Sequence, residues 1–227
     1  MLSTLSLRAL LGLATASCLL ATAAPAVAGP LDFDHQQALI ITAERLFGYS
    51  YSSTKDAGDN KSIDSNFSLL APSGGAGAAY GAPTIGVHYP VIPALTLGLN
   101  LGLVRTGGSI EPKGGTSQDK DSSLGILLAP RVGYVLGINE GAYIWLRAGI
   151  SYYRSSTGDD DKTKVVTSGV GLSADPMFVL TPVNHFGIMV GPVVDYPLSG
   201  STKVGDGNSA DLTITNFGLQ FGLLGYL

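Results

Sequence analysis

The sequence predicts an all-β protein, an eight-stranded antiparallel up-and-down transmembrane β-barrel. A hairpin unit that begins with proline recurs at positions 83, 130 and 176, so its spacings are 47 and 46 residues. Apolar residues alternate with small or polar ones over eight stretches, which is how a membrane barrel distributes its hydrophobicity. Mean hydropathy is high, at +0.29, and only 13% of the residues are charged. Ordinary soluble domains contain roughly 25% charged residues.

The repeating unit consists of a strand, a short turn, a second strand and a long polar loop. A period of this length is typical of arrays of supersecondary units. A propeller blade needs four strands, and this unit holds two. A β-sandwich is the other alternative, but its outward faces would carry solubilising charge. Here the non-apolar face holds mainly Gly, Ser, Thr and Asn, which suits a narrow barrel interior filled by side chains.

Period-2 alternation justifies the first four strands. The segment FGYSY supports a strand near 38–53, and TIGVHY supports one near 80–90. The clearest alternation is LTLGLNLGL, in the expected strand 95–105. The segment LGILLAPRVGY supports a strand near 123–136. Each stretch contains at least the ~9–11 residues that a tilted membrane strand requires.

The second half of the chain follows the same rule. The segment YIWLRAGISYY predicts a strand near 142–154, and VVTSGVGLSADPMFVL predicts one near 164–180. The last two strands are expected near 186–198 and 212–227. The connections alternate in length: short turns at 91–94, 137–141 and 182–185, and long polar loops at 54–79, 106–122, 155–164 and 199–211. Eight strands with alternating connections place both chain ends on the side of the short turns.

The first 28 residues have the features of a cleaved secretion signal. Arg8 precedes an apolar stretch at 10–24, and Ala26 and Ala28 supply the small-x-small pattern that signal peptidase cleaves. The apolar stretch is short for a transmembrane anchor. Cys18 lies within the signal, so we expect a mature chain without cysteine, supported by a bilayer rather than by disulfides.

Aromatic residues gather near the expected strand ends. In membrane barrels such residues form two girdles at the membrane interfaces. The sequence predicts girdle positions for Tyr49, Tyr51, Tyr89, Tyr143, Trp145, Tyr152 and Tyr196.

Four charged residues fall on the expected interior faces of neighbouring strands. Arg131, Arg147, Asp175 and Asp195 alternate in sign, and a buried guanidinium needs carboxylate partners. Glu44 joins this set as a fifth candidate. We expect a structural polar network in the lumen, and an ion-conducting lumen is the alternative. The neighbouring Arg45 would then point outward, either near the membrane interface on the short-turn side or at a bulge, and the sequence leaves both locations open.

The sequence also resembles a known group of proteins. The alternating strands, the signal and the final strand FGLQFGLLGYL are similar to those of small eight-stranded outer-membrane β-barrel proteins of Gram-negative bacteria. The resemblance implies a bacterial outer-membrane location, with residues 29–37 as a short periplasmic segment and 38–227 as the barrel. It also implies that the barrel-insertion machinery reads the final strand, through Phe217, Phe221, Tyr226 and Leu227. Most such proteins end in an aromatic residue, whereas this chain ends in leucine.

No residue pattern in the chain indicates an enzyme or a cofactor. The three histidines are dispersed, no Gly-x-Ser-x-Gly elbow occurs, and Asp159–Asp161 lack the spaced pattern of a calcium loop. We therefore expect a non-enzymatic monomer with a structural, adhesive or surface-recognition role. Its expected partners are membrane lipid, lipopolysaccharide and an unknown extracellular ligand. A formal charge of −4 without a basic run excludes a typical nucleic-acid interface. A narrow channel, and less so a lipid-modifying enzyme that uses His88, remain the alternatives.

Overall fold

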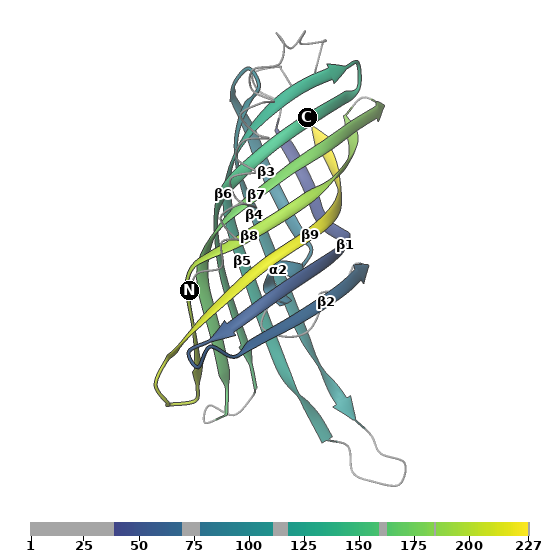
Figure 1. Cartoon of the computed structure of the whole chain (residues 1–227). Coiled ribbons are helices and arrows are strands. Elements are labelled where there is room, and N and C mark those ends of the chain that lie inside the picture. Colours follow the sequence, from purple (N-terminus) through teal and green to yellow (C-terminus); the bar gives the residue numbers. More distant parts are fainter. Residues whose placement is uncertain (1–38, 70–77, 111–117, 159–162, 184, 227) are drawn as a thin grey trace.

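The computed structural model describes residues 39–69, 78–110, 118–158, 163–183 and 185–226. The described chain forms one antiparallel sheet that curls into a barrel, and Figure 1 shows its tilted strands side by side. The elements are β1 (Ile40–Asp56), β2 (Lys61–Leu69), α2 (Ala78–Gly81), β3 (Thr84–Ile92), β4 (Leu95–Ile110), β5 (Gln118–Asn139), β6 (Ala142–Thr157), β7 (Val165–Val183), β8 (Phe186–Val204) and β9 (Ala210–Tyr226).

Eight strands close the ring in the up-and-down order that the sequence predicts. Each of β3 to β9 pairs with its neighbour in sequence, and β1 closes the barrel against β9 from Ile40 opposite Tyr226 to Asp56 opposite Leu212. The three predicted short turns each contain a residue with positive φ: Ala94 (66°), Gly141 (83°) and His185 (66°). These left-handed residues let the chain reverse within a few positions. In the described part of the chain no helix is long and apolar enough to cross a membrane.

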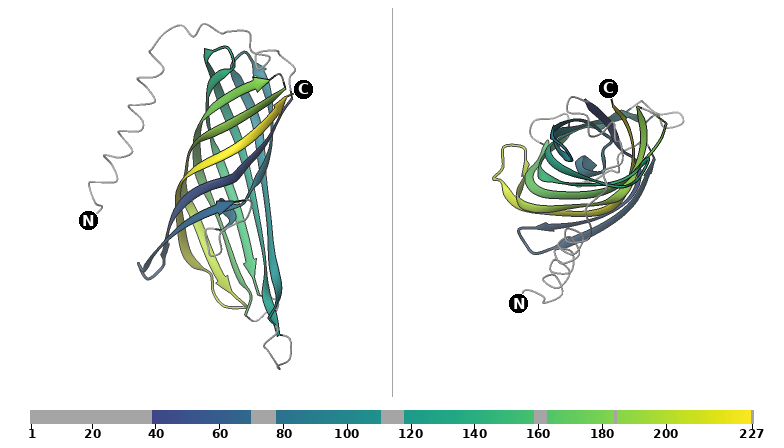
Figure 2. Two further views of the ribbon diagram at one scale, coloured as in Figure 1. Left: turned by 90° about the vertical axis from the view of Figure 1, so that its right-hand side faces the viewer. Right: turned by 90° about the horizontal axis from the view of Figure 1, so that it is seen from above.

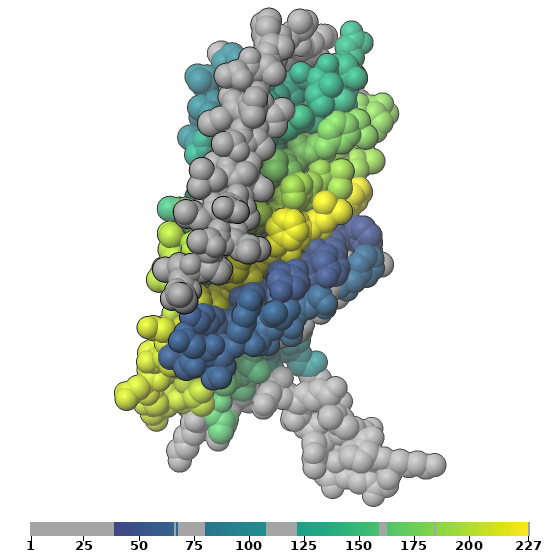
Figure 3. Space-filling model, in the orientation of Figure 1, coloured from purple at the N-terminus to yellow at the C-terminus, as the bar shows by residue number. Residues whose placement is uncertain are grey.

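The region between β1 and β3 differs from the prediction. We expected one loop over 54–79 and a strand from residue 80, but β2 pairs with the outer half of β1 and α2 precedes β3. The strand β3 therefore pairs only with Ile40–Glu44 of β1. The polar residues of 61–69 resemble a loop in composition, and pairing with β1 overrides that local tendency. Figure 3 shows β9, β1 and β2 as neighbouring bands on one face.

The predicted long loops near 106–122 and 199–211 also begin and end with strand. The strand β4 continues to Ile110, β5 begins at Gln118, and β8 continues to Val204. These extensions are rich in polar residues and lack the apolar alternation that would predict a strand. The sequence pattern therefore located the membrane-facing portion of each strand and missed its polar extension.

The interior contains two apolar clusters rather than small residues throughout. The cluster at the short-turn end consists of Ile40, Val135, Tyr143, Trp145, Met177, Val179, Met189, Leu224 and Tyr226. The cluster toward the long-loop end consists of Tyr80, Leu127, Tyr153, Leu212 and Ile214. Along β6, Trp145 of the first cluster is followed by the buried Arg147 and then by Tyr153 of the second. A charged layer thus lies between two apolar layers.

The outer surface carries an apolar belt. Large apolar side chains are exposed on every strand of the ring, among them Ile41, Ile85, Leu97, Leu103, Val132, Ile150, Leu172, Val190, Phe217 and Leu219. Monomeric soluble proteins rarely expose contiguous apolar patches of this extent. A lipid bilayer accounts for a belt that surrounds the barrel while charged residues occupy its centre.

Candidate functional site

Arg147 occupies the centre of the charged layer. Its two terminal nitrogens donate to Glu44, with Nη1–Oε1 at 2.6 Å and Nη2–Oε2 at 2.8 Å. Nη2 also donates to Asp175 Oδ2 from across the β6–β7 pair. The guanidinium carbon lies 4.7 Å from the centre of the Trp145 ring. Planar two-point pairing of this kind is a property of arginine that lysine lacks.

Glu44 is buried among polar partners from four strands, of which three supply hydrogen-bond donors. Thr42 Oγ1 donates to its Oε1 over 2.6 Å, and Asn100 Nδ2 donates to its Oε2 over 3.0 Å. His88 Nε2 lies 3.8 Å from Oε1. A buried carboxylate needs such a set of partners to offset the loss of water. The predicted fifth member of the network therefore holds β1, β3, β4 and β6 together.

Arg131 extends the layer toward the long-loop end. Its Nε lies 3.4 Å from Asp175 Oδ1, and its Nη1 donates to the carbonyl of Ile150 over 3.2 Å. Asp175 thus lies between two guanidinium groups, Arg131 on β5 and Arg147 on β6. Both arginines are almost completely buried.

Arg45 points into the barrel, so the expectation that it points outward is wrong. Between Ala43 and Phe47 the register against β9 shifts, and Arg45 lies in this bulge with φ of 56°. Left-handed backbone is unfavourable for a residue with a long side chain. Here it turns Arg45 inward directly after the inward Glu44, so two successive residues of one strand both reach the lumen.

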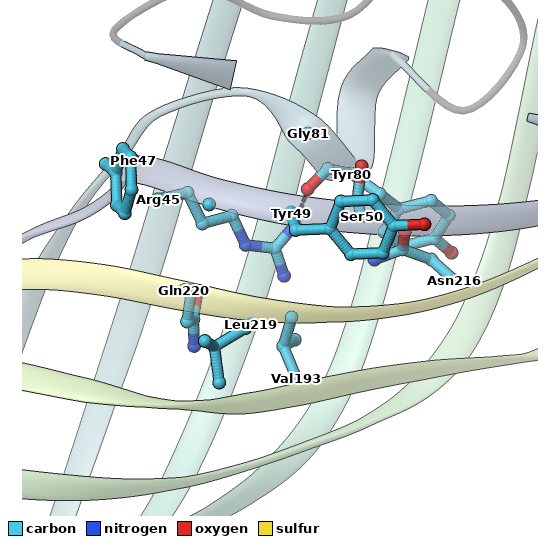
Figure 4. Close-up of a pocket in the computed structure, with 11 residues that line it drawn as sticks. Arg45, Phe47, Tyr49, Ser50, Tyr80, Gly81, Val193, Asn216, Leu219 and Gln220 are labelled. Carbon is cyan, nitrogen blue, oxygen red and sulfur yellow. Dashed lines mark hydrogen bonds between the residues drawn. The ribbon is translucent and has the colours of Figure 1, made fainter. Parts of the chain in front are cut away.

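Arg45 connects the barrel wall to α2. Its Nη1 donates to the backbone carbonyl of Tyr80 (Figure 4). Its Nη2 lies 3.4 Å from Asp195 Oδ2. Asp195 also accepts from Ser173 Oγ and, over 3.0 Å, from Asn216 Nδ2. The sequence analysis did not assign this role to Arg45. Two adjacent charged residues within an alternating strand were the signal that could have indicated a bulge.

The helix α2 lies inside the barrel. Seen from above, it lies within the ring of strands (Figure 2), and its Tyr80 is 1% exposed. The Tyr80 ring packs on Tyr153 of β6 with ring centres 4.9 Å apart. The cavity beside α2, lined by Arg45 and Tyr80 among others, has about 20 Å³ of space, enough for about one water molecule. The helix α2 and its buried Tyr80 therefore occupy part of the lumen at this level.

The charged layer is balanced. In the described part of the chain the buried charged side chains are three arginines and three carboxylates: Arg45, Arg131, Arg147, Glu44, Asp175 and Asp195. All five residues of the predicted network lie in the barrel interior, and Arg45 is the sixth. Removal of one partner from such a set leaves a buried charge uncompensated, which costs far more than an exposed ion pair contributes.

Two predicted girdle residues are not on the membrane surface. Trp145 is 0% and Tyr143 3% exposed, and both belong to the apolar cluster inside the barrel. The prediction of girdle positions for these two residues is wrong. Trp145 Nε1 donates to Thr96 Oγ1 over 3.1 Å, and its ring meets His88 edge-on at 4.8 Å. Because Tyr143 and Trp145 alternate with the outward Ile144, both point inward. Their nearness to a strand end therefore does not place them in a girdle.

The other predicted aromatic residues do face outward. Side chains between 38% and 53% exposed are found at Tyr49, Tyr51, Tyr89, Tyr152 and Tyr196. In the final strand Phe217 is exposed and Phe221 half-buried, whereas Tyr226 lies inside the barrel and its ring packs against His185. Recognition of this strand by the insertion machinery stays a prediction. The cleavage residues Ala26 and Ala28, Asp159–Asp161 and Leu227 lie outside the described residues.

The site provides little support for a catalytic centre. Across the described ranges, no group of three or more His, Cys, Asp or Glu side chains could hold a metal ion. The neighbours of His88 are Glu44 and Trp145, while the Ser173 hydroxyl donates to Asp195. A serine nucleophile needs a base within hydrogen-bond reach. Ser173 and His88 each contact a different carboxylate, so these two described residues do not form a nucleophile–base pair.

Comparison with known proteins supports the fold alone. No protein-family model and no curated protein sequence matches the chain. Among solved structures it is similar to Neisserial surface protein A, with 13% identity and a TM-score of 0.51 over 83% of this chain and 97% of that one. It is also similar to the outer membrane protein OprG from Pseudomonas aeruginosa, with 10% identity and a TM-score of 0.53 over 86% and 98% of the two chains.

Both similar structures are bacterial outer-membrane proteins, and each is covered almost completely. The closed ring of eight strands, the apolar belt and the charged interior agree with that likeness. The chain is an eight-stranded antiparallel β-barrel of the bacterial outer-membrane type.

Proposed function

We propose that this chain is a non-conducting, non-enzymatic outer-membrane barrel that presents a rigid contact surface outside the cell. The single observation that carries the proposal is the filled interior. An ion crossing the lumen would meet an apolar cluster, the charged layer, α2 and a second apolar cluster in turn. Eight-stranded barrels have interiors that side chains can fill completely.

The extracellular strand extensions supply the surface. The strand β5 has 22 residues, and β7 and β8 have 19 each, whereas a tilted strand needs about 9–11 residues to cross a bilayer. The hairpin of β1 and β2 adds a ninth strand at this end of the barrel. A surface built on paired strands loses less conformational entropy when a partner binds than a flexible loop would.

Conductance separates this proposal from the channel that the sequence left open. The purified barrel is reconstituted in planar bilayers, and we expect no stable conductance steps. Stable steps that disappear in Arg147→Leu or Asp175→Asn would overturn the proposal in favour of a channel.

Cell attachment tests the contact surface itself. Cells that express the full-length protein are compared with cells that express a shortened variant. In this variant residues 108–121 are replaced by an introduced Asn-Gly turn, which closes the β4–β5 hairpin. We expect expression to increase cell–cell aggregation or attachment to surfaces, and the shortened variant to lose that increase while it keeps the heat-dependent gel migration of a folded barrel. Equal attachment by cells with and without the protein would contradict the role.

A further inference from the structure

Four cations lie on the outside of the barrel in a continuous stretch from β4 to β8. Arg105 on β4, Arg154 on β6 and Lys203 on β8 share the outward face of their strands with exposed apolar residues, and Lys164 directly precedes β7. We call these four residues the basic rim. Neither the lumen nor the proposed contact role requires them to gather on one side.

The rim residues line two adjacent clefts. Arg105 and Lys164 line one of about 270 Å³ together with Ser122 and Ser156. Lys164 also lines a second cleft of about 520 Å³, together with Arg154 and Lys203. The strand register agrees, since Lys203 lies opposite Val166 and Arg154 lies opposite Ser168 on β7. Lys164 therefore belongs to both clefts and joins them.

The basic rim follows directly on the apolar belt. Arg105 is two residues beyond the exposed Leu103, and Arg154 is two residues beyond the exposed Tyr152. Residues two apart on a strand share a face and are about 7 Å apart along it. Since the belt faces lipid tails, this step places the guanidinium groups at the level of the lipid headgroups on the long-loop side.

Among the described side chains that line the two clefts, cations outnumber carboxylates. In the described part of the chain, the larger cleft is lined by three cations and one carboxylate, Asp206. The smaller cleft is lined by two cations and, among the described side chains, by no carboxylate. The contrast with β1 and β2 is direct, because there Lys55 Nζ lies 2.5 Å from Asp59 Oδ1.

We propose that the basic rim binds the phosphate groups of outer-leaflet lipid headgroups. Arginine and lysine form charge-assisted hydrogen bonds with phosphate, and the serine hydroxyls of both clefts add donors for the remaining oxygens. When the acyl chains of a lipid pack against the apolar belt, its phosphate lies at the level of the basic rim. The occupant is therefore a phosphate that is tethered to a lipid rather than a phosphate free in solution.

The test measures lipid selectivity of the folded full-length barrel in phosphatidylcholine vesicles. Spin-labelled phosphatidic acid and spin-labelled diacylglycerol differ only in the phosphate, and spin resonance reports the fraction of each held at the protein surface. We expect phosphatidic acid to be favoured over diacylglycerol. Because each basic residue near an anionic headgroup contributes a factor of about five, the double variant Lys164→Gln/Lys203→Gln should weaken that preference about 25-fold.

A matched variant tests whether position matters. Lys55→Gln/Lys61→Gln removes the same charge from the β1–β2 hairpin, and we expect it to retain the selectivity. Equal loss in both double variants would overturn the proposal, as would equal binding of the two lipids by the unchanged protein. Inorganic phosphate at millimolar concentration should not displace the lipid, and complete displacement would indicate a site for the free ion instead. Heat-dependent gel migration checks that each variant is folded.

Discussion

Arg147 and Glu44 form a two-point ion pair across the centre of the barrel, with both nitrogen–oxygen distances below 3 Å. The two residues are separated by 103 positions in sequence and lie on β6 and β1, which are not neighbours in the sheet. The pair therefore spans the lumen rather than one strand ladder. It fixes the distance between opposite walls in a way that backbone hydrogen bonds alone do not.

Replacement of Arg147 should destabilise the barrel strongly. In Arg147→Leu the carboxylates of Glu44 and Asp175 lose their shared partner while both stay buried, so we expect a loss of about 3–5 kcal/mol in the free energy of unfolding. Urea-induced unfolding in lipid vesicles measures it. The exposed Lys61→Leu on β2, outside the basic rim, provides the control and should stay within about 0.5 kcal/mol. Equal effects of the two substitutions would show that the lumen pair has no special role.

Trp145 offers a direct optical test of its position, because it is the only tryptophan of the chain. Inside the barrel, in contact with His88 and Arg147, it should be protected from brominated lipids, and its fluorescence should not be quenched. Tyr196→Trp in a Trp145→Phe background provides the control, since residue 196 is 53% exposed on the outer surface. Strong quenching of the Trp145 fluorescence would contradict its position inside the barrel and would support the girdle position.

Glycines in the lumen should be sensitive to the addition of one methyl group. A Cβ at Gly133 would lie 2.5 Å from Thr96 Oγ1, and one at Gly98 would lie 2.5 Å from the ring atom Cγ of His88. Overpacking of this kind costs about 1–3 kcal/mol, so Gly133→Ala and Gly98→Ala should lower the urea midpoint. In Gly107→Ala the nearest atom would be 3.7 Å away, and the midpoint should be unchanged. A loss of similar size in all three variants would contradict the prediction.

The β1–β2 turn should respond to acid. The hydrogen bond from the Asn60 side chain, together with those from the backbone of Asn60 and Gly58, holds the pKa of Asp56 below its ordinary value of 3.8. The carboxylate therefore stabilises the turn fully above the ordinary value, and this contribution is lost as the pH falls through the lowered pKa. The protection of the Gly58 and Asn60 amides against exchange, relative to their intrinsic rates at each pH, should fall in that acidic range. In Asp56→Asn the pH dependence should disappear, and its persistence there would exclude Asp56 as the cause.

The membrane-facing part of the fold was predictable because it depends on local alternation. The five leucines of 95–105 share a face in any extended chain, and β4 starts at the predicted residue. The inward positions of Arg131, Arg147 and Asp175 follow from the same period of two. Alternation is weaker where the strands leave the bilayer. In β2 only Ile63, Phe67 and Leu69 are apolar among charged and polar residues, and for this reason β2 was missed.

The sequence by itself determined which residues face lipid and which face the lumen, since a strand alternates its faces at every step. Only the tertiary structure decided which lumen residues meet. Glu44 contacts Arg147 because closure of β1 against β9 brings the two walls within side-chain reach. Arg45 turns inward because a bulge with positive φ breaks the alternation. Such contacts depend on ring closure and register, which couple residues far apart in sequence and leave no local periodic signal.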